Sequence, residues 1–107
     1  MASTDKDGYT RIPNKLLEAM YDRKHHFTQL QFRVMCYIIR KTYGWNKYSD
    51  YISISAMAKD LRRERRNVFR AVSDLEKSGV LKIIRTGAGK VNDICINPPS
   101  DWGRPVS

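Results

Sequence analysis

The sequence has no long hydrophobic run and very little cysteine. No apolar stretch approaches the roughly 18 residues of a membrane-spanning helix, and Met1–Asp7 lacks the apolar segment of a secretory signal peptide. We therefore expect a cytoplasmic protein with no membrane partner. The cysteines are Cys36 and Cys95, which we expect to be free thiols, each buried as a small apolar side chain.

Patterns typical of catalysis and metal binding are also missing. His25 and His26 are adjacent, so a helix would point them apart, and no cysteine or carboxylate stands at metal-ligand spacing. Residues 87–90 lack the Ser or Thr and the following helix of a phosphate-binding loop, and a hairpin turn explains them better. We expect no enzymatic activity, no metal and no cofactor.

Acidic residues are few beside the basic ones. Twenty lysines and arginines face 11 aspartates and glutamates, which gives a formal net charge of +9. This excess favours a polyanionic partner, with nucleic acid ahead of an anionic membrane surface, and a basic but unspecialised surface is the alternative. The 107 residues, 41% of them hydrophobic, suffice for one globular domain.

Hydrophobic periodicity predicts helices over most of the chain. The first opens at Pro13. The second starts at Thr28, which forms a capping box with Gln31, and runs to about Thr42 with Gly44 as its left-handed cap.

Two further helices follow a short possible strand at residues 51–54. Ser53 caps the first of them. After residues 62–64 the next runs to about Ser78, where Gly79 stops it.

The last part of the chain changes to strand periodicity. Val80–Thr86 and Val91–Ile96 form a hairpin around a turn at 87–90, and the prolines after Asn97 end it. We expect a flexible start at 1–8, one domain at 9–97 and a tail at 98–107, from which Trp102 is able to fold back. The order predicts an α+β fold, mainly helical with a small β-hairpin, of the winged helix-turn-helix kind.

The helix before the hairpin separates apolar from basic residues. Val68, Ala71, Val72 and Leu75 share one face, so the basic residues point away from the core. Arginine forks onto guanine edges or phosphates, and asparagine pairs with adenine edges. The candidate residues for binding double-stranded DNA are Arg62, Arg63, Arg65, Arg66, Asn67, Arg70, Ser73 and Lys77, with Arg85 and Lys90 in the hairpin. The alternative is a solvated charged face, and several of these groups are expected to hold phosphates rather than read bases.

Several blocks of sequence resemble the bacteriophage replication protein O family, the lambda-type origin-binding initiators. The blocks are 8–14 with 16–19, 39–47, 52–55, 66–68 and 75–81, and residues 40–47 (RKTYGWNK) are the most specific. The resemblance implies sequence-specific binding of repeated sites at a phage replication origin in a bacterial host, initiation of DNA replication, and usually a homodimer. A replicative helicase or its loader is implied as a partner only if a further C-terminal region exists.

The chain also departs from the family pattern. The turn before the basic helix has Arg62-Arg63 where the family commonly has glycine and an apolar residue. Phe69 stands where a small polar residue is common, and it either meets a thymine methyl or packs on a partner.

Three alternatives remain open at this point. The loop 43–47 has two interpretations. Either Lys47 reaches the DNA backbone, or the aromatic residues of the loop pack against the base of the domain, and we favour the second. The protein is alternatively a transcriptional regulator, or a protein-docking module in which Phe69 and other aromatics form the interface.

Overall fold

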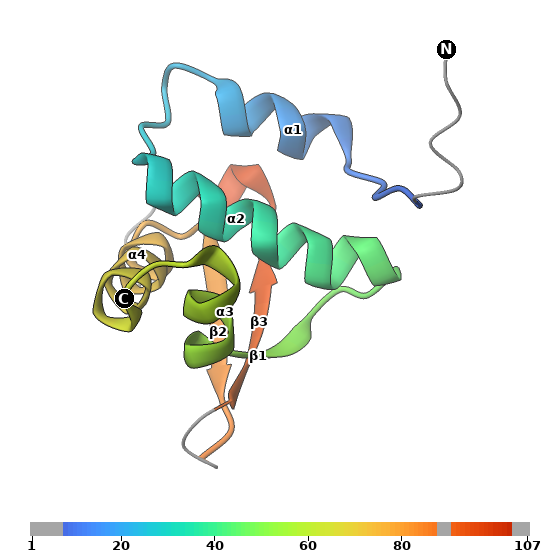
Figure 1. Ribbon diagram of the computed structural model, residues 1–107. Helices are drawn as coiled ribbons and strands as arrows, with labels where there is room; N and C mark the ends of the chain where they lie inside the picture. The colour runs from blue at the N-terminus through green and yellow to red at the C-terminus, as the bar shows by residue number, and fades with distance from the viewer. Residues whose placement is uncertain (1–7, 88–90, 104–107) are drawn as a thin grey trace.

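The computed structural model describes residues 8–87 and 91–103, which form an α+β fold as predicted (Figure 1). Helices pack on one face of a three-stranded antiparallel sheet. The elements in order are α1 (Asn14–Tyr21), α2 (Gln29–Thr42), the 3-10 turn η2 (Tyr43–Trp45), β1 (Asp50–Ser53), α3 (Ile54–Leu61), α4 (Arg65–Lys77), β2 (Leu81–Arg85), β3 (Val91–Ile96) and the 3-10 turn η3 (Pro99–Asp101).

The start of α2 follows the predicted capping box. The Gln31 backbone N–H donates to Thr28 Oγ1 at 3.1 Å, and the Thr28 backbone N–H donates to Gln31 Oε1 at 3.0 Å. These two bonds satisfy amide groups that a helix start leaves without intrahelical partners. They fix where α2 begins, directly beside α4.

The end of α2 differs from the prediction. The helix stops at Thr42, but the left-handed residue is Asn46 (φ 56°) rather than Gly44. The chain first passes through η2, and the Lys47 N–H then donates to the Thr42 carbonyl at 2.9 Å. Gly44 instead lies close to the Arg40 side chain, whose Nη1 would be 2.7 Å from a Cβ at this position and would have to shift.

The predicted hairpin is present, and β1 adds a third strand to it. The sheet order is β1-β3-β2, with Tyr51 opposite Asp93 in the β1–β3 pair. β1 ends at Ser53, whose Oγ accepts from the Ala56 N–H at 3.2 Å and caps α3 as predicted. The predicted turn at 87–90 lies largely outside the described residues, since only Gly87 of it is described.

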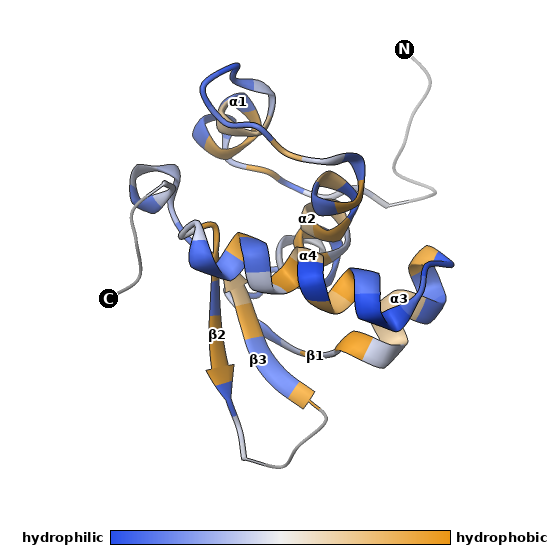
Figure 2. Ribbon diagram, turned by 90° about the vertical axis from the view of Figure 1, so that its left-hand side faces the viewer, coloured by the Kyte–Doolittle hydropathy of each residue, from blue (hydrophilic) through white to orange (hydrophobic). Residues whose placement is uncertain are grey.

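The core lies between the helices and the inner face of the sheet. Figure 2 shows polar and apolar residues alternating along α4, as expected of a helix with one buried face. The fully buried large side chains include Met35 and Ile38 of α2, Met57 of α3, Val68 and Leu75 of α4, and Leu81 and Ile94 of the sheet. α4 is therefore held by its apolar stripe, and its orientation is fixed.

Trp102 does fold back on the core. It is 6% exposed, its indole N–H donates to the Asn97 carbonyl at 3.0 Å, and its ring meets Phe27 edge-on at 5.8 Å between centroids. Residues 98–103 therefore pack against the domain through this side chain.

The two cysteines are free, but only Cys95 is buried. The expectation for Cys36 is wrong because α2 turns it outward while its neighbour Met35 enters the core. Within the described residues, no helix combines the length and the apolar character needed to cross a membrane.

Candidate nucleic-acid interface

The predicted division of α4 into two faces is confirmed. Val68, Ala71, Val72 and Leu75 are buried, while Arg66, Arg70 and Lys77 are exposed. Ser73 is the exception among the candidates, because it is only partly accessible. The helix thus turns a basic face to solvent.

A tight turn joins α3 to α4 and points the start of α4 outward. Arg62 takes a left-handed conformation with φ 56°, and the Arg63 N–H donates to the Ala58 carbonyl at 3.1 Å. Glycine adopts this conformation at no steric cost, whereas other L-residues are strained there. Arg62 therefore fills the geometric role of the glycine that the family pattern leads one to expect.

Arg65 is the one arginine near this turn with a hydrogen-bond partner among the described residues. Its Nε donates to Ser55 Oγ of α3 at 3.0 Å. The side chains of Arg62, Arg63, Arg66 and Arg70 are exposed and make no hydrogen bond or ion pair within residues 8–87 and 91–103. Four positively charged groups at this end of α4 are thus available to an external anion.

Three of the candidate residues border one shallow hollow. Arg63, Asn67 and Arg70 line a space of about 210 Å³ between α4 and the start of α2, where Thr28 and Gln31 form its opposite wall. Asp74 also lines it, so the positive charge is strongest toward the start of α4. Sequence reasoning missed Thr28 and Gln31 as neighbours of this site, since their capping pattern indicates only a helix start.

Lys77 lies apart from this group. It is eleven positions after Arg66, and at about 1.5 Å per residue the two are about 16 Å apart along the axis. Lys77 is the last residue of α4, where a cation also stabilises the helix dipole.

The candidate residues of the hairpin differ from the arginines at the start of α4. Arg85 places Nη1 and Nη2 at 3.0 Å from the two carboxylate oxygens of Glu76 on α4. This bidentate pair joins β2 to α4 and compensates the charge of Arg85. Lys90 lies outside the described residues.

Of the aromatic residues in the loop after α2, Tyr43 packs against the core as expected, whereas Trp45 does not. Trp45 is 62% exposed, and the guanidinium carbon of Arg40 lies 5.5 Å from its ring centroid. Tyr43 is only half-buried, and this burial raises its pKa. Lys47 contacts Asp50 at 3.4 Å in an exposed pair. The indole faces solvent because η2 carries it beyond the end of α2.

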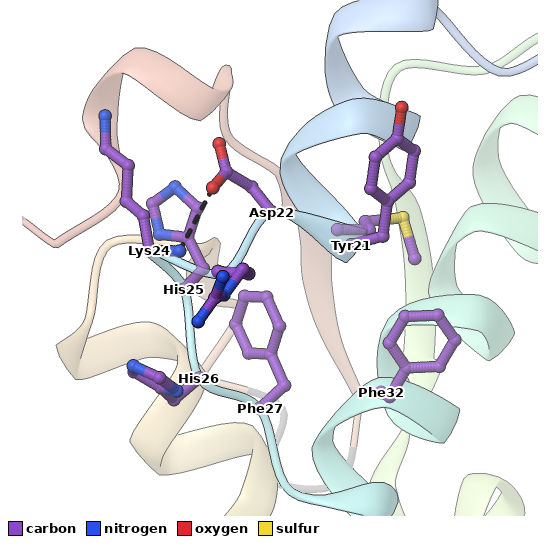
Figure 3. Close-up of a pocket in the computed structure, with 9 residues that line it drawn as sticks. Tyr21, Asp22, Lys24, His25, His26, Phe27 and Phe32 are labelled. Atoms are coloured by element: carbon purple, nitrogen blue, oxygen red, sulfur yellow. Dashed lines mark hydrogen bonds between the residues drawn. The ribbon is translucent and has the colours of Figure 1, made fainter.

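A hollow of about 680 Å³ lies between α1 and α2 at residues 20–27 and Phe32. Figure 3 shows Tyr21 and Phe32 on one side of it, with His25 and Phe27 on the other. The Asp22 carboxylate accepts the backbone N–H of Lys24 at 3.0 Å. The ring of His25 packs against Trp102. Within the part of the chain described, no three His, Cys, Asp or Glu side chains are grouped to hold a metal ion.

These features define the class of protein: a small α+β domain that holds a basic helix by its apolar stripe and turns to solvent four arginines whose side chains are unpaired among the described residues. Comparison with known proteins then identifies the family. The chain belongs to the family described as bacteriophage replication protein O, whose sequence pattern matches residues 1–97. The resemblance inferred from the sequence blocks is thereby confirmed.

Two curated relatives illustrate the similarity. The chain is 37% identical over 76 residues to replication protein O of Escherichia phage lambda. This aligned segment covers 71% of this chain and 22% of the relative. It is 33% identical over 101 residues to DNA replication protein gp18 of Salmonella phage P22, which covers 94% of this chain and 35% of the relative. The matched segments thus span about a third or less of the length of each relative. No solved structure matches it.

Proposed function

We propose that this domain is a winged helix-turn-helix that binds double-stranded DNA sequence-specifically at a phage replication origin and takes part in initiating replication. The observation that carries the proposal is the set of exposed arginine side chains that have no partner in the described part of the chain, namely Arg62, Arg63, Arg66 and Arg70. Family membership supports the replication context.

In this proposal α3, the tight turn and α4 act as the helix-turn-helix, and β2 with β3 act as the wing. The major groove, about 12 Å wide, admits one α-helix, and the start of such a helix usually meets the base edges. Arg66, Asn67 and Arg70 lie at that end of α4. Their side chains suit guanine edges, adenine edges or phosphates.

We assign the remaining candidate residues according to the contacts that their side chains already make. Arg62 and Arg63 at the turn suit phosphate contacts, which fix the register of a protein on DNA. Arg65 is already held by Ser55 and Arg85 by Glu76, so we assign them mainly to positioning α4 and the hairpin. Lys90 and Lys77 remain candidates for the DNA backbone.

We further propose that the domain binds without catalysing a reaction, in the cytoplasm of the bacterial host. A homodimer on repeated half-sites is part of the proposal, because the family resemblance implies it. A replicative helicase or its loader is a partner only if a further C-terminal region exists.

Phe69 supports a second candidate, a protein-docking module. Its side chain is 52% exposed although it lies on α4 itself. On DNA this ring suits a thymine methyl, whereas in a docking module it would enter a pocket of a partner protein.

The proposal is tested by selecting bound sequences from a pool of random duplexes at low salt. We expect one motif to be enriched and to occur repeatedly in the origin of the phage that encodes the protein. Enrichment of promoter sites alone would indicate a transcriptional regulator. The absence of duplex binding at low salt would overturn the proposal and leave the docking module.

A further inference from the structure

A second surface combines aromatic and cationic groups at the far end of α2 from α4. The start of α2 lines the hollow beside α4, whereas Arg40 and Gly44 lie at its other end. The 14 residues of α2 span about 21 Å, which separates the two surfaces. Figure 1 shows α4 and the end of α2 on opposite sides of the molecule.

Two exposed aromatic rings border this second surface. Tyr9, 65% exposed, comes from the segment before α1, and Trp45, 62% exposed, comes from η2. Both line a hollow of about 170 Å³ together with Arg40 and Thr10. Large aromatic side chains bury a large apolar area when they are covered, so leaving two of them open at one place needs an explanation.

Arg40 gives this hollow its charge. Its guanidinium lies over one face of the Trp45 ring, at 5.5 Å from the centroid. Because the indole is mostly exposed, its remaining surface is open to a second planar group. None of the described residues that line the hollow is acidic, so the charge of Arg40 remains available to an anion.

Gly44 lies directly against the side chains of Arg40 and Thr10. A Cβ at this position would lie 2.7 Å from Arg40 Nη1 and 3.2 Å from Thr10 Oγ1. Gly44 is not in a left-handed conformation, so a substitution here would act by displacing the end of the Arg40 side chain. The backbone of η2 therefore leaves room for the guanidinium between Thr10 and the indole.

We propose that Tyr9, Arg40 and Trp45 form a binding site for the unpaired bases of a single-stranded nucleic acid, separate from the duplex-binding face of α4. Proteins that bind single strands combine aromatic platforms for stacking with cations for the phosphates. Bases inside a duplex are stacked on each other, so their faces are closed to these rings. The hollow is smaller than the 300–1,000 Å³ typical of small-molecule sites, which suits a base lying across it.

The inference does not rest on duplex binding by α4. It is tested with the full chain, a fluorescent 15-nucleotide oligothymidine and its oligouridine counterpart, by anisotropy at low salt. Stacking contributes about 1 kcal/mol or more per base, which is about five-fold in affinity. We therefore expect Trp45→Ala to weaken binding of at least one of these strands about five-fold or more. The strand affected distinguishes DNA from RNA as the ligand.

Three controls separate stacking from other effects. Tyr21→Ala removes another exposed ring at a different place on the surface and should leave the affinity unchanged. Gly44→Ala should weaken binding by displacing Arg40 while keeping both the ring and the charge. An abasic strand of the same length should bind more weakly than oligothymidine.

Fluorescence gives a second readout, because the two tryptophans differ in exposure. Oligothymidine should quench the emission of Trp45, and the quenching should vanish in Trp45→Ala, where the buried Trp102 remains. Thermal unfolding monitored by circular dichroism confirms that each variant is folded.

The proposal is overturned if neither strand binds at low salt, if Trp45→Ala and Tyr21→Ala behave alike, or if the abasic strand binds as well as oligothymidine. It is also overturned if binding of the single strand is lost in Arg66→Ala/Arg70→Ala and kept in Trp45→Ala. Loss of duplex binding alone in that double variant leaves the second site in place, so the two proposals fail separately.

Discussion

Both terminal nitrogens of Arg85 donate to the carboxylate of Glu76 at 3.0 Å, which ties the hairpin to α4. The arginines at the start of α4 have no such partner among the described residues. The candidate interface therefore contains one arginine whose charge is compensated by a carboxylate and several whose charge is not. This difference decides which cations are available to DNA.

The first prediction follows from this contrast. Arg85→Ala should weaken duplex binding less than Arg66→Ala, because the charge of Arg85 is already compensated by Glu76. The exposed pair contributes about 0.2–1 kcal/mol to stability, so the unfolding free energy should change only slightly. Anisotropy with a labelled duplex and urea denaturation measure the two effects, and equal losses of affinity would contradict the assignment.

The second prediction concerns the left-handed turn residue. Arg62→Gly should stabilise the domain by about 0.5–1 kcal/mol, because relief of about 1–2 kcal/mol of strain exceeds the entropic cost of glycine. Arg63→Gly is the matched control, since Arg63 does not have a positive φ and should lose stability. Urea denaturation of both variants gives the comparison, and destabilisation by Arg62→Gly would show that the turn is not strained.

The third prediction contrasts the two tryptophans. Trp102 is 6% exposed and Trp45 is 62% exposed. Trp102→Ala should lower the unfolding free energy by about 3–5 kcal/mol, as is usual for a large buried ring. Trp45→Ala should change it by no more than about 0.5 kcal/mol. A loss in Trp102→Ala as small as that expected for Trp45→Ala would mean that Trp102 does not belong to the core.

The fourth prediction concerns alkaline pH. Burial, together with its hydrogen bond to Asp60 at 2.7 Å, raises the pKa of Tyr37 to about 12 from an ordinary value of 10.0. The hydroxyl stays protonated in the folded state while the unfolded state loses the proton, so its contribution is present below pH 10 and is lost as the pH rises toward 12. Stability should therefore fall over this range.

Tyr37→Phe isolates this contribution. The variant cannot ionise at this position, so its stability should depend less on pH between 10 and 12 than that of the unmodified chain. Urea denaturation at several pH values measures the difference. Identical pH profiles would show that Tyr37 has an ordinary pKa in the folded protein.

The sequence predicts those features that depend on neighbouring residues. The Thr28–Gln31 capping box, the apolar stripe of α4 and the bounds of β3 each follow from local spacing and are confirmed. The family was also recognisable from short blocks.

Features that depend on contacts between distant segments were not predictable. The pairing of β1 with β3 brings Tyr51 opposite Asp93, far along the chain. The exposure of Cys36 and Trp45, and the pairing of Arg85 with Glu76, depend on how whole elements pack. Composition alone cannot distinguish a compensated arginine from a free one.

The central claim is tested most directly by the duplex affinity of Arg66→Ala/Arg70→Ala, measured by anisotropy across a range of salt concentrations on selected and random DNA. The matched control is Arg23→Ala/Arg33→Ala, which removes the same charge from exposed positions outside α4. The account predicts a loss of about 1–3 kcal/mol per base-reading arginine in the α4 variant and little loss in the control. Equal affinity of the two double variants would contradict it.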